Sequence, residues 1–177
     1  MCLYPKDDEQ EADMSNTENP KIEHVCFTGH RNLDAAHATL IPSVLEQILR
    51  TLIRHGATNF YAGGALGFDT VAAIAVLRLK KEFPHIKLAL ILPCKTQTKM
   101  WGENDRAVYN AILECADSIE YVHENYTSYC MHDRNRRLVD CADLCVAYCE
   151  HNGGGTAYTM AYALKQNKEV INISDLI

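Results

Sequence analysis

The amino-acid sequence predicts a Rossmann-like, doubly wound α/β fold, which is a three-layer sandwich with a mainly parallel sheet of about six strands. Two observations support this prediction. Short apolar runs rich in β-forming residues alternate with longer segments of helical spacing throughout residues 21–177. In addition, glycine-rich stretches follow several of these runs. Parallel strands joined by right-handed helical crossovers are the economical way to bury such an alternation.

The predicted strands are short, apolar and bounded by turn residues. They span residues 22–27, 59–61, 86–92, 118–122, 144–148 and 169–173. Between them, apolar residues recur at separations of three and four, which places them on one face of a helix. The first helix is the best example, with Leu40, Val44, Leu45, Ile48, Leu49, Leu52 and Ile53. Gly56 and Pro84 are expected to mark the ends of the first two helices.

Length and composition fit one domain. With 177 residues, 47% of them hydrophobic, the chain has enough apolar material for a single substantial core. Residues 1–20 contain six acidic residues and one lysine, so this stretch carries −5 of the net charge of −6. It has few large apolar residues, and such a composition cannot offset the entropy of ordering. We therefore expect an acidic disordered tail over 1–20 and one folded domain over 21–177.

The sequence lacks the marks of secretion and of membrane insertion. It has no basic start followed by an apolar run, and no stretch approaches the roughly 18 consecutive apolar residues of a membrane span. We therefore expect a cytoplasmic protein with no membrane partner. Outside the acidic tail the net charge is only −1, so the domain has no strong general field for nucleic acid. This balance disfavours nucleic acid as a partner.

The eight cysteines predict neither a zinc site nor a disulfide framework. None of them forms a C-x-x-C pair, so the usual zinc spacings are absent. Cys26 and Cys145 lie in apolar runs, where a free cysteine behaves as a small buried hydrophobic residue. The best metal-binding alternative is a cluster of Cys130 and His132 with a later cysteine. We expect no bound metal and no cofactor.

The residues expected to bind a ligand follow the strands. In an open parallel sheet, ligands bind beyond the carboxyl ends of the strands, where helix N-termini present free amides and a positive dipole. The first loop at such a position is Thr28-Gly29-His30-Arg31. Its glycine allows the backbone to approach a ligand closely, and His30 and Arg31 are candidates for binding an anion. The alternative for Arg31 is an ordinary solvated charge.

Two further loops are rich in glycine. Gly63-Gly64-Ala65-Leu66-Gly67 resembles a phosphate cradle between a strand and a helix of small residues. Asp69 follows it, and this carboxylate either caps the helix or braces the loop by accepting backbone amides, or contacts the ligand. The other loop is Gly153-Gly154-Gly155-Thr156, where adjacent glycines are costly unless unusual backbone angles or a close approach require them. Three such loops at equivalent topological positions indicate a shared binding site.

Other candidates lie between these loops. Pro93, Gln97 and Trp101 follow the third strand, and Arg134 and Asn135 precede the fifth. Trp101 either stacks on a base or covers the edge of the core. Several arginines cluster between positions 134 and 137, but residues two apart cannot share a helix face. At most one or two of these arginines should therefore reach a ligand.

In combination, these motifs resemble the YpsA-like branch of the SLOG superfamily. The similarity runs from about residue 22 to the last residue; its ordered motifs are Cys26-Phe27-Thr28-Gly29-His30-Arg31, Gly63-Gly64-Ala65 with Gly67 and Asp69, Pro93 with Gln97 and Trp101, Arg134-Asn135, Val139-Asp140, and Gly154-Gly155-Thr156. The superfamily has a Rossmann-like fold proposed to bind nucleotides and related ligands. It includes the Lonely Guy phosphoribohydrolases and the DNA-processing protein A family. The resemblance implies no settled reaction for the YpsA-like branch.

The same resemblance bears on catalysis. Lonely Guy enzymes share a P-G-G-x-G-T-x-x-E signature whose glutamate is catalytic. In the matching stretch, His151 stands at the proline position and Thr159 at the glutamate position, while the glycines and Thr156 are kept. A threonine cannot act as the carboxylate that stabilises positive charge at a ribosyl carbon. Asp69, Glu103 and Asp105 are the remaining candidates for a catalytic carboxylate.

The sequence therefore predicts a sensor or binding protein for a nucleotide or another phosphorylated small molecule. Amides of residues 63–67 and 153–156 are expected to hold the phosphate, assisted by Arg31 or Arg134, with the base near Trp101. A phosphoribohydrolase acting on a nucleoside 5′-monophosphate is the first alternative, and single-stranded DNA binding is the second. Whether the chain forms a homodimer is left open.

Overall fold

Six parallel strands form one sheet, in the order β4-β3-β2-β1-β5-β6, in the computed structural model, which describes residues 21–177. The elements are β1 His24–Gly29, α1 Ala35–Ala38, α2 Ile41–Arg54, β2 Asn59–Ala62, α3 Phe68–Leu79, β3 Lys87–Cys94, α4 Glu103–Cys115, β4 Ser118–His123, α5 Cys130–Asp140, β5 Leu144–Tyr148, α6 Gly154–Lys165, β6 Glu169–Asn172 and the 3-10 turn η1 Ile173–Asp175. All six predicted strands are present, with ends within two residues of the expected ones. The acidic tail expected over 1–20 lies outside the described residues.

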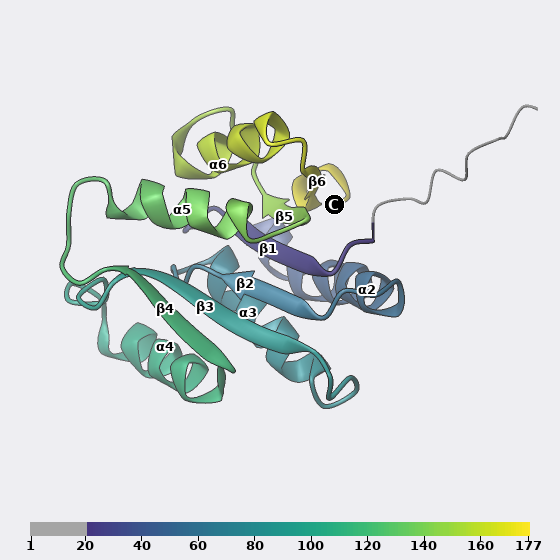
Figure 1. The fold of residues 1–177 in the computed structure, drawn as a ribbon, viewed down its shortest axis with the longest axis horizontal. Coiled ribbons are helices and arrows are strands. Elements are labelled where there is room, and N and C mark those ends of the chain that lie inside the picture. Colours follow the sequence, from purple (N-terminus) through teal and green to yellow (C-terminus); the bar gives the residue numbers. More distant parts are fainter. Residues whose placement is uncertain (1–20) are drawn as a thin grey trace, which may run out of the picture.

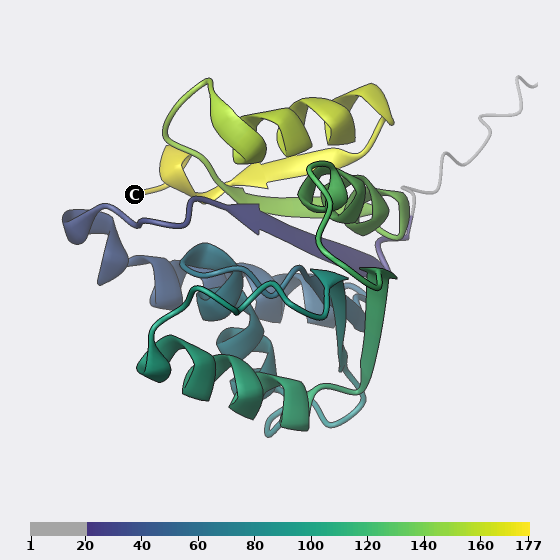
Figure 2. The same cartoon turned by 90° about the vertical axis from the view of Figure 1, so that its left-hand side faces the viewer.

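Helices cover both faces of the sheet. Helices α2, α3 and α4 lie on one face, and α5 and α6 lie on the other (Figures 1 and 2). This arrangement confirms the predicted doubly wound, three-layer sandwich. The sheet is entirely parallel over the described residues, where the sequence predicted a mainly parallel one. In residues 21–177, no helix combines the length and the apolar character needed to cross a bilayer.

The sequence pattern of α2 explains its position. Ile41, Leu45, Leu49 and Ile53 recur every four residues, and all four are buried against the sheet. Gly56 follows the helix with a φ of 113°, a left-handed conformation that glycine adopts without strain. The predicted helix stop is therefore confirmed, and the chain turns directly into β2.

Alternate residues of the central strands contribute to two cores. In β1, Val25 and Phe27 face the core beneath α2, α3 and α4, while Cys26 faces the core beneath α5 and α6. Cys145 of β5 is the register partner of Cys26, and both are buried. A hydrogen bond to Cys145, together with burial, raises the pKa of the Cys26 thiol well above its ordinary value. The expected role of both cysteines as buried hydrophobic residues is confirmed.

The order in which strands are added to the sheet reverses between β1 and β5. From β1 the chain adds β2, β3 and β4 on one side, and then returns through α5 to place β5 on the other side. The loops that follow β1 and β5 therefore lead to helices on opposite faces. Gly29 and Tyr148, the last residues of these strands, are register partners. The crevice beyond such a pair of carboxyl ends is where open α/β sheets bind ligands.

Candidate functional site

A cavity of about 310 Å³ opens at this crevice. Its predicted site residues are Thr28, Gly29, His30, Arg31, Ala65, Asp69, Arg134, Asn135, Gly155 and Thr156. A second cavity, of about 420 Å³, shares Gly29, Arg31 and Ala65 with the first and adds Gln97 and Trp101. We call the two cavities together the cleft. The topology thus brings together residues that are more than 100 positions apart in the sequence.

The other predicted residues do not line the cleft. They are Gly63, Gly64, Gly67, Pro93, Glu103, Gly153 and Gly154. Pro93 is buried inside β3, because this strand runs two residues further than the sequence predicted. Glu103 is the exposed first residue of α4. Its side chain is not part of the lining of either cavity.

Asp69 braces the loop before α3. Its Oδ2 accepts hydrogen bonds from the amides of Gly63 (3.1 Å) and Ala65 (3.3 Å). The N-cap position of α3 is Gly67, so the prediction that Asp69 caps this helix is wrong and its loop-bracing alternative is right. Burial raises the pKa of the Asp69 carboxyl, an effect opposed by the charge of Arg134 and by the two amides. The two amides that Asp69 holds are no longer free for a phosphate.

Arg134 reaches Asp69 from α5, across the sheet edge. Its Nη1 donates to the carbonyl of Gly63 at 2.6 Å and to Asp69 Oδ2 at 3.3 Å. The side chain is only 8% exposed, and burial lowers the pKa of its guanidinium, which nevertheless stays protonated in proteins. Among residues 21–177, the buried Nε of Arg134 has no hydrogen-bond partner. A buried cationic donor without a partner is costly, so an anion that came within hydrogen-bond distance of it would be stabilising.

The second glycine loop, Gly63–Gly67, is tightly packed. A Cβ on Gly63 would lie 1.7 Å from Nη1 of Arg134. On Gly67, whose φ is 79°, it would lie 2.2 Å from the carbonyl oxygen of Arg31. Gly64 has a φ of 65°, and its Cβ would meet the side chain of Leu92 at 2.4 Å. All three glycines are therefore required by the packing of the protein itself.

The third glycine loop, Gly153–Gly155, is open. Among the described residues beyond its chain neighbours, a Cβ on Gly153 or Gly154 would meet no heavy atom within 4 Å, and on Gly155 it would meet only Asn135 Nδ2, at 3.9 Å. Gly153 is the N-cap of the 12-residue helix α6 and provides no side-chain cap. The first amides of α6 therefore lack a side-chain partner and lie beside the cleft, where Gly155 and Thr156 form part of its lining.

Trp101 and Arg31 form the other end of the cleft. The guanidinium of Arg31 lies 5.8 Å from the centre of the Trp101 ring, and Trp101 packs edge-on against Tyr109 at 5.5 Å. Gln97 donates through Nε2 to the hydroxyl of Tyr109 and to the carbonyl of Gly64. Trp101 is half-buried, so one part of the ring packs on the protein while the other lines the cleft.

Helix α5 contributes two lining residues that the sequence analysis missed. Met131 and Leu138 line the cavity together with Arg134 and Asn135, and the four lie on one face at positions i, i+3, i+4 and i+7. The helical spacing of Met131 and Leu138 from Arg134 was the signal in the sequence that could have identified them. Arg136 points away and donates to the hydroxyl of Tyr158, which confirms that it does not share this face.

Two sequence-based alternatives can be located in the structure. Thr159, at the position of the catalytic glutamate in the Lonely Guy signature, is buried, and its hydroxyl donates to the carbonyl of Gly155 at 2.7 Å. Cys130 is buried, while the ring of His132 packs edge-on against Tyr158, so this pair forms no ligand cluster. The group that could hold a metal is a different one, formed by His30, Glu150 and His151.

Comparison with known proteins finds a family model that matches most of the chain, and bacterial relatives with similar sequences. The YpsA family model, described as the YspA SLOG family, matches residues 25–176. UPF0398 protein BH1768 of Halalkalibacterium halodurans is 34% identical over 134 residues, which are 74% of this chain and 71% of the relative. The SPbeta prophage-derived protein YoqJ of Bacillus subtilis is 30% identical over 135 residues, which are 70% of this chain and 77% of the relative.

A solved structure shares the fold. DNA processing protein A from Helicobacter pylori, described for its single-stranded DNA binding mode, superposes with a TM-score of 0.60 and 18% identity. The match covers 84% of this chain but only 63% of that protein, so the chain spans less than two thirds of it. Because the family model spans nearly all described residues, and the ordered motifs point the same way, the chain belongs to the YpsA family of the SLOG superfamily.

Proposed function

We propose that the chain binds a nucleotide, or a related phosphorylated small molecule, in the cleft, and that it acts as a binding protein or sensor. The observation that carries the proposal is Arg134, which lines the crevice cavity and whose buried Nε has no hydrogen-bond partner among the described residues. An unsatisfied buried donor is costly, and a phosphate oxygen would satisfy it with a charge-assisted hydrogen bond. The open N-terminus of α6 supplies further donors at the same cavity.

The proposed phosphate lies between Arg134 and the amides of Gly155 and Thr156. The sequence predicted that amides of residues 63–67 and of residues 153–156 hold the phosphate. Because the amides of Gly63 and Ala65 already bind Asp69, the proposed phosphate site uses amides of the second group. The negative charge of Asp69 is offset by Arg134, so it does not dominate the field in the cavity. The exposed Arg31 is near enough to the lining to add a second positive charge.

The base, or its equivalent, would lie in the second cavity against Trp101. An indole face stacks on any base, a contact worth about 1–3 kcal/mol. The cation of Arg31 beside the ring would contact both the base and the phosphate. This arrangement suits a compact ligand that has an anionic group at one end and a flat apolar group at the other.

Binding is favoured over N-glycosidic hydrolysis. Asp69 is the only carboxylate among the described residues that line the 310 Å³ crevice cavity, and it is committed to Arg134 and two amides. Thr159 replaces the glutamate of the hydrolase signature and is buried in α6. We therefore expect no free base to accumulate when the protein is incubated with nucleoside monophosphates. Catalytic base release, detected by chromatography, would favour the hydrolase instead.

A thermal-shift screen against nucleoside monophosphates, dinucleotides and sugar phosphates tests the proposal. A ligand present at 100 times its dissociation constant adds about 2.7 kcal/mol of stability, which is a readily measured rise in Tm. The best ligand is then titrated by calorimetry. If none of these compounds stabilises the protein, the proposal is wrong.

A matched pair of variants locates the site. Gly155→Ala adds a methyl group beside the cleft without backbone strain, and we expect it to weaken ligand affinity at least tenfold, or about 1.4 kcal/mol. Gly102→Ala makes the same change at the N-cap of α4, where the added Cβ has room and lies outside the cleft. Its affinity should equal that of the wild type. Equal losses in both variants would move the ligand out of the cleft.

Single-stranded DNA is the competing ligand, since the fold is shared with DNA processing protein A. Binding to a DNA backbone should weaken steeply with added salt as counterions are released. A mononucleotide site should show a shallow salt dependence and little competition from oligonucleotides. Micromolar or tighter binding of an unstructured oligonucleotide at physiological salt would make DNA the preferred ligand.

A further inference from the structure

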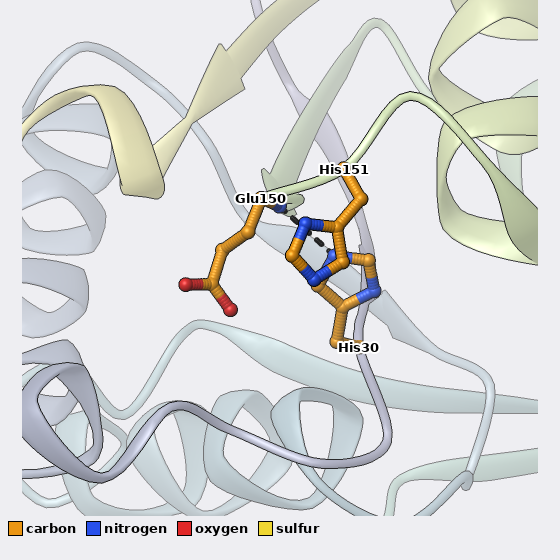
Figure 3. A group of neighbouring side chains, drawn as sticks. All are labelled: His30, Glu150 and His151. Carbon is orange, nitrogen blue, oxygen red and sulfur yellow. Dashed lines mark hydrogen bonds between the residues drawn. The ribbon is translucent and has the colours of Figure 1, made fainter.

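Three side chains of metal-binding type meet at the rim of the cleft. His30 follows β1, while Glu150 and His151 follow the neighbouring strand β5. Their ligand atoms all lie within 4.8 Å of one another. Figure 3 shows the imidazole rings of His30 and His151 lying one over the other, with Glu150 beside them. The pairing of β1 with β5 brings together residues that are 120 positions apart.

The backbone already fixes part of this group. The amide of Glu150 donates to Nε2 of His30 at 2.9 Å, which ties the loop after β5 to the loop after β1. A carboxylate oxygen of Glu150 lies 3.3 Å from Nδ1 of His37, and the hydroxyl of Tyr148 lies 3.1 Å from the same nitrogen. His37 is therefore placed to orient the Glu150 carboxylate, much as outer hydrogen bonds orient metal ligands elsewhere.

The remaining movement that a metal requires is small. Tetrahedral ligands with bonds of about 2.1 Å lie about 3.4 Å apart, so the group must tighten from its present spacing. The ring centroids of His30 and His151 are 5.3 Å apart and tilted by 30°. His151 is exposed, so its side chain is free to rotate toward the other two. A metal bound at Nε2 of His30 would replace the hydrogen bond from the Glu150 amide.

We propose that His30, Glu150 and His151 bind a divalent transition metal ion, with Zn²⁺ as the best match. Two imidazoles and one carboxylate form a ligand set typical of zinc sites that keep an open position. Mg²⁺ and Ca²⁺ prefer sites built from oxygen ligands and fit this group poorly.

A metal ion bound by these three residues would lie next to the cleft. His30 also lines the 310 Å³ crevice cavity, so a metal bound by it would lie close to an anionic group in that cavity. Metal binding itself does not depend on the proposed nucleotide. The site is therefore tested with the metal alone, and its failure would leave the proposed function untouched.

Calorimetric titration of the metal-free protein with Zn²⁺, in competition with a chelator of known affinity, is the direct test. We expect one tight site per chain. His151→Ala changes an exposed side chain and should fold normally, and we expect its Zn²⁺ affinity to fall at least tenfold. His85→Ala is the matched control, since His85 packs edge-on against Phe83, away from the cleft. Wild-type affinity in His151→Ala would overturn the proposal.

Thiols must be distinguished from imidazoles, because Cys149 precedes Glu150 and its Sγ donates to the carbonyl of His151. Co²⁺ bound by nitrogen and oxygen has visible absorption but lacks the near-ultraviolet charge-transfer band of thiolate ligation. We expect no such band, and the same spectrum in Cys149→Ser. A strong thiolate band that disappears in Cys149→Ser would assign the metal to cysteine and overturn the proposed ligand set.

Discussion

The second and third glycine loops look alike in the sequence but serve different purposes in the structure. In the second loop, a Cβ on Gly63, Gly64 or Gly67 would lie within 2.4 Å of another atom of the protein. In the third loop, a Cβ on Gly153 or Gly154 would meet nothing within 4 Å. Both loops link a strand to a helix, so topology does not separate them. What differs is whether the space beside the glycine is already filled.

The contrast between the two loops indicates which of them has room for a ligand. The second loop is filled by the protein itself, since Asp69 and Arg134 occupy the position that a bound phosphate would take in a free cradle. The third loop has the amides of a helix N-terminus, and its N-cap residue, Gly153, has no side chain to bind them. Glycine in the packed loop should therefore matter for stability, and glycine in the open loop for binding.

Removing the brace of the packed loop should have the largest effect. Asp69→Ala leaves the buried guanidinium of Arg134 without its counter-charge and frees the amides of Gly63 and Ala65. Breaking a buried ion pair in this way costs about 3–5 kcal/mol, which denaturant unfolding measures directly. Glu114→Ala, at an exposed acid on α4, is the control and should stay within about 0.5 kcal/mol of the wild type.

The double variant Asp69→Ala with Arg134→Met sharpens this prediction. Once the unpaired charge is removed as well, part of the lost stability should return, because the penalty lies in the uncompensated cation. If the losses of unfolding free energy in the two single variants simply add in the double variant, Asp69 and Arg134 are not energetically coupled. The proposed stabilisation of the packed loop by this ion pair would then be wrong.

Gly67→Ala should cost somewhat less, about 3 kcal/mol. A left-handed backbone costs an alanine about 1–2 kcal/mol, and the Cβ would also lie 2.2 Å from a backbone carbonyl, which cannot easily move aside. Unfolding free energy is again the measurement. Gly102→Ala, at a glycine with a φ of −63°, should be nearly neutral. A loss below about 1 kcal/mol in Gly67→Ala would contradict the close packing of this loop.

The open loop should show the smallest effects on stability. Gly154 has a φ of 84° but no neighbour, so Gly154→Ala should cost only the backbone strain of about 1–2 kcal/mol. Gly155→Ala has neither strain nor a close contact and should remain within about 0.5 kcal/mol of the wild type. Denaturant unfolding of both, side by side, measures the difference. A large loss in Gly155→Ala would mean that this loop is also packed.

The order of elements in the sequence was sufficient to predict the sheet and its layers. Strand ends were less certain, and the clearest error followed from this. Pro93 was placed in a loop after the third strand, but β3 continues through it to Cys94. Proline is tolerated there because the strand ends one residue later, where the ladder hydrogen bond that proline lacks is least needed. Local propensity gives no sign of this extension.

The sequence indicated which residues lie around the crevice better than it indicated what each of them does there. Thr28, Arg31, Ala65 and Thr156, which the motifs predict to share a site, line one cavity, because parallel strands place their following loops at one edge of the sheet. Spacing along the chain could not reveal that Asp69 would be held by Arg134, 65 residues away. Nor could it distinguish a glycine needed for packing from one left open to a ligand.

Apolar periodicity and residues close together in the chain were enough to predict the alternation of strands and helices, the family, and the edge of the sheet where the loops meet. The folded structure was needed to see which donors are already used, which glycines are packed, and that His30 lies beside Glu150 and His151. The reason is physical: whether a buried polar group is satisfied depends on partners that the fold brings from distant parts of the chain.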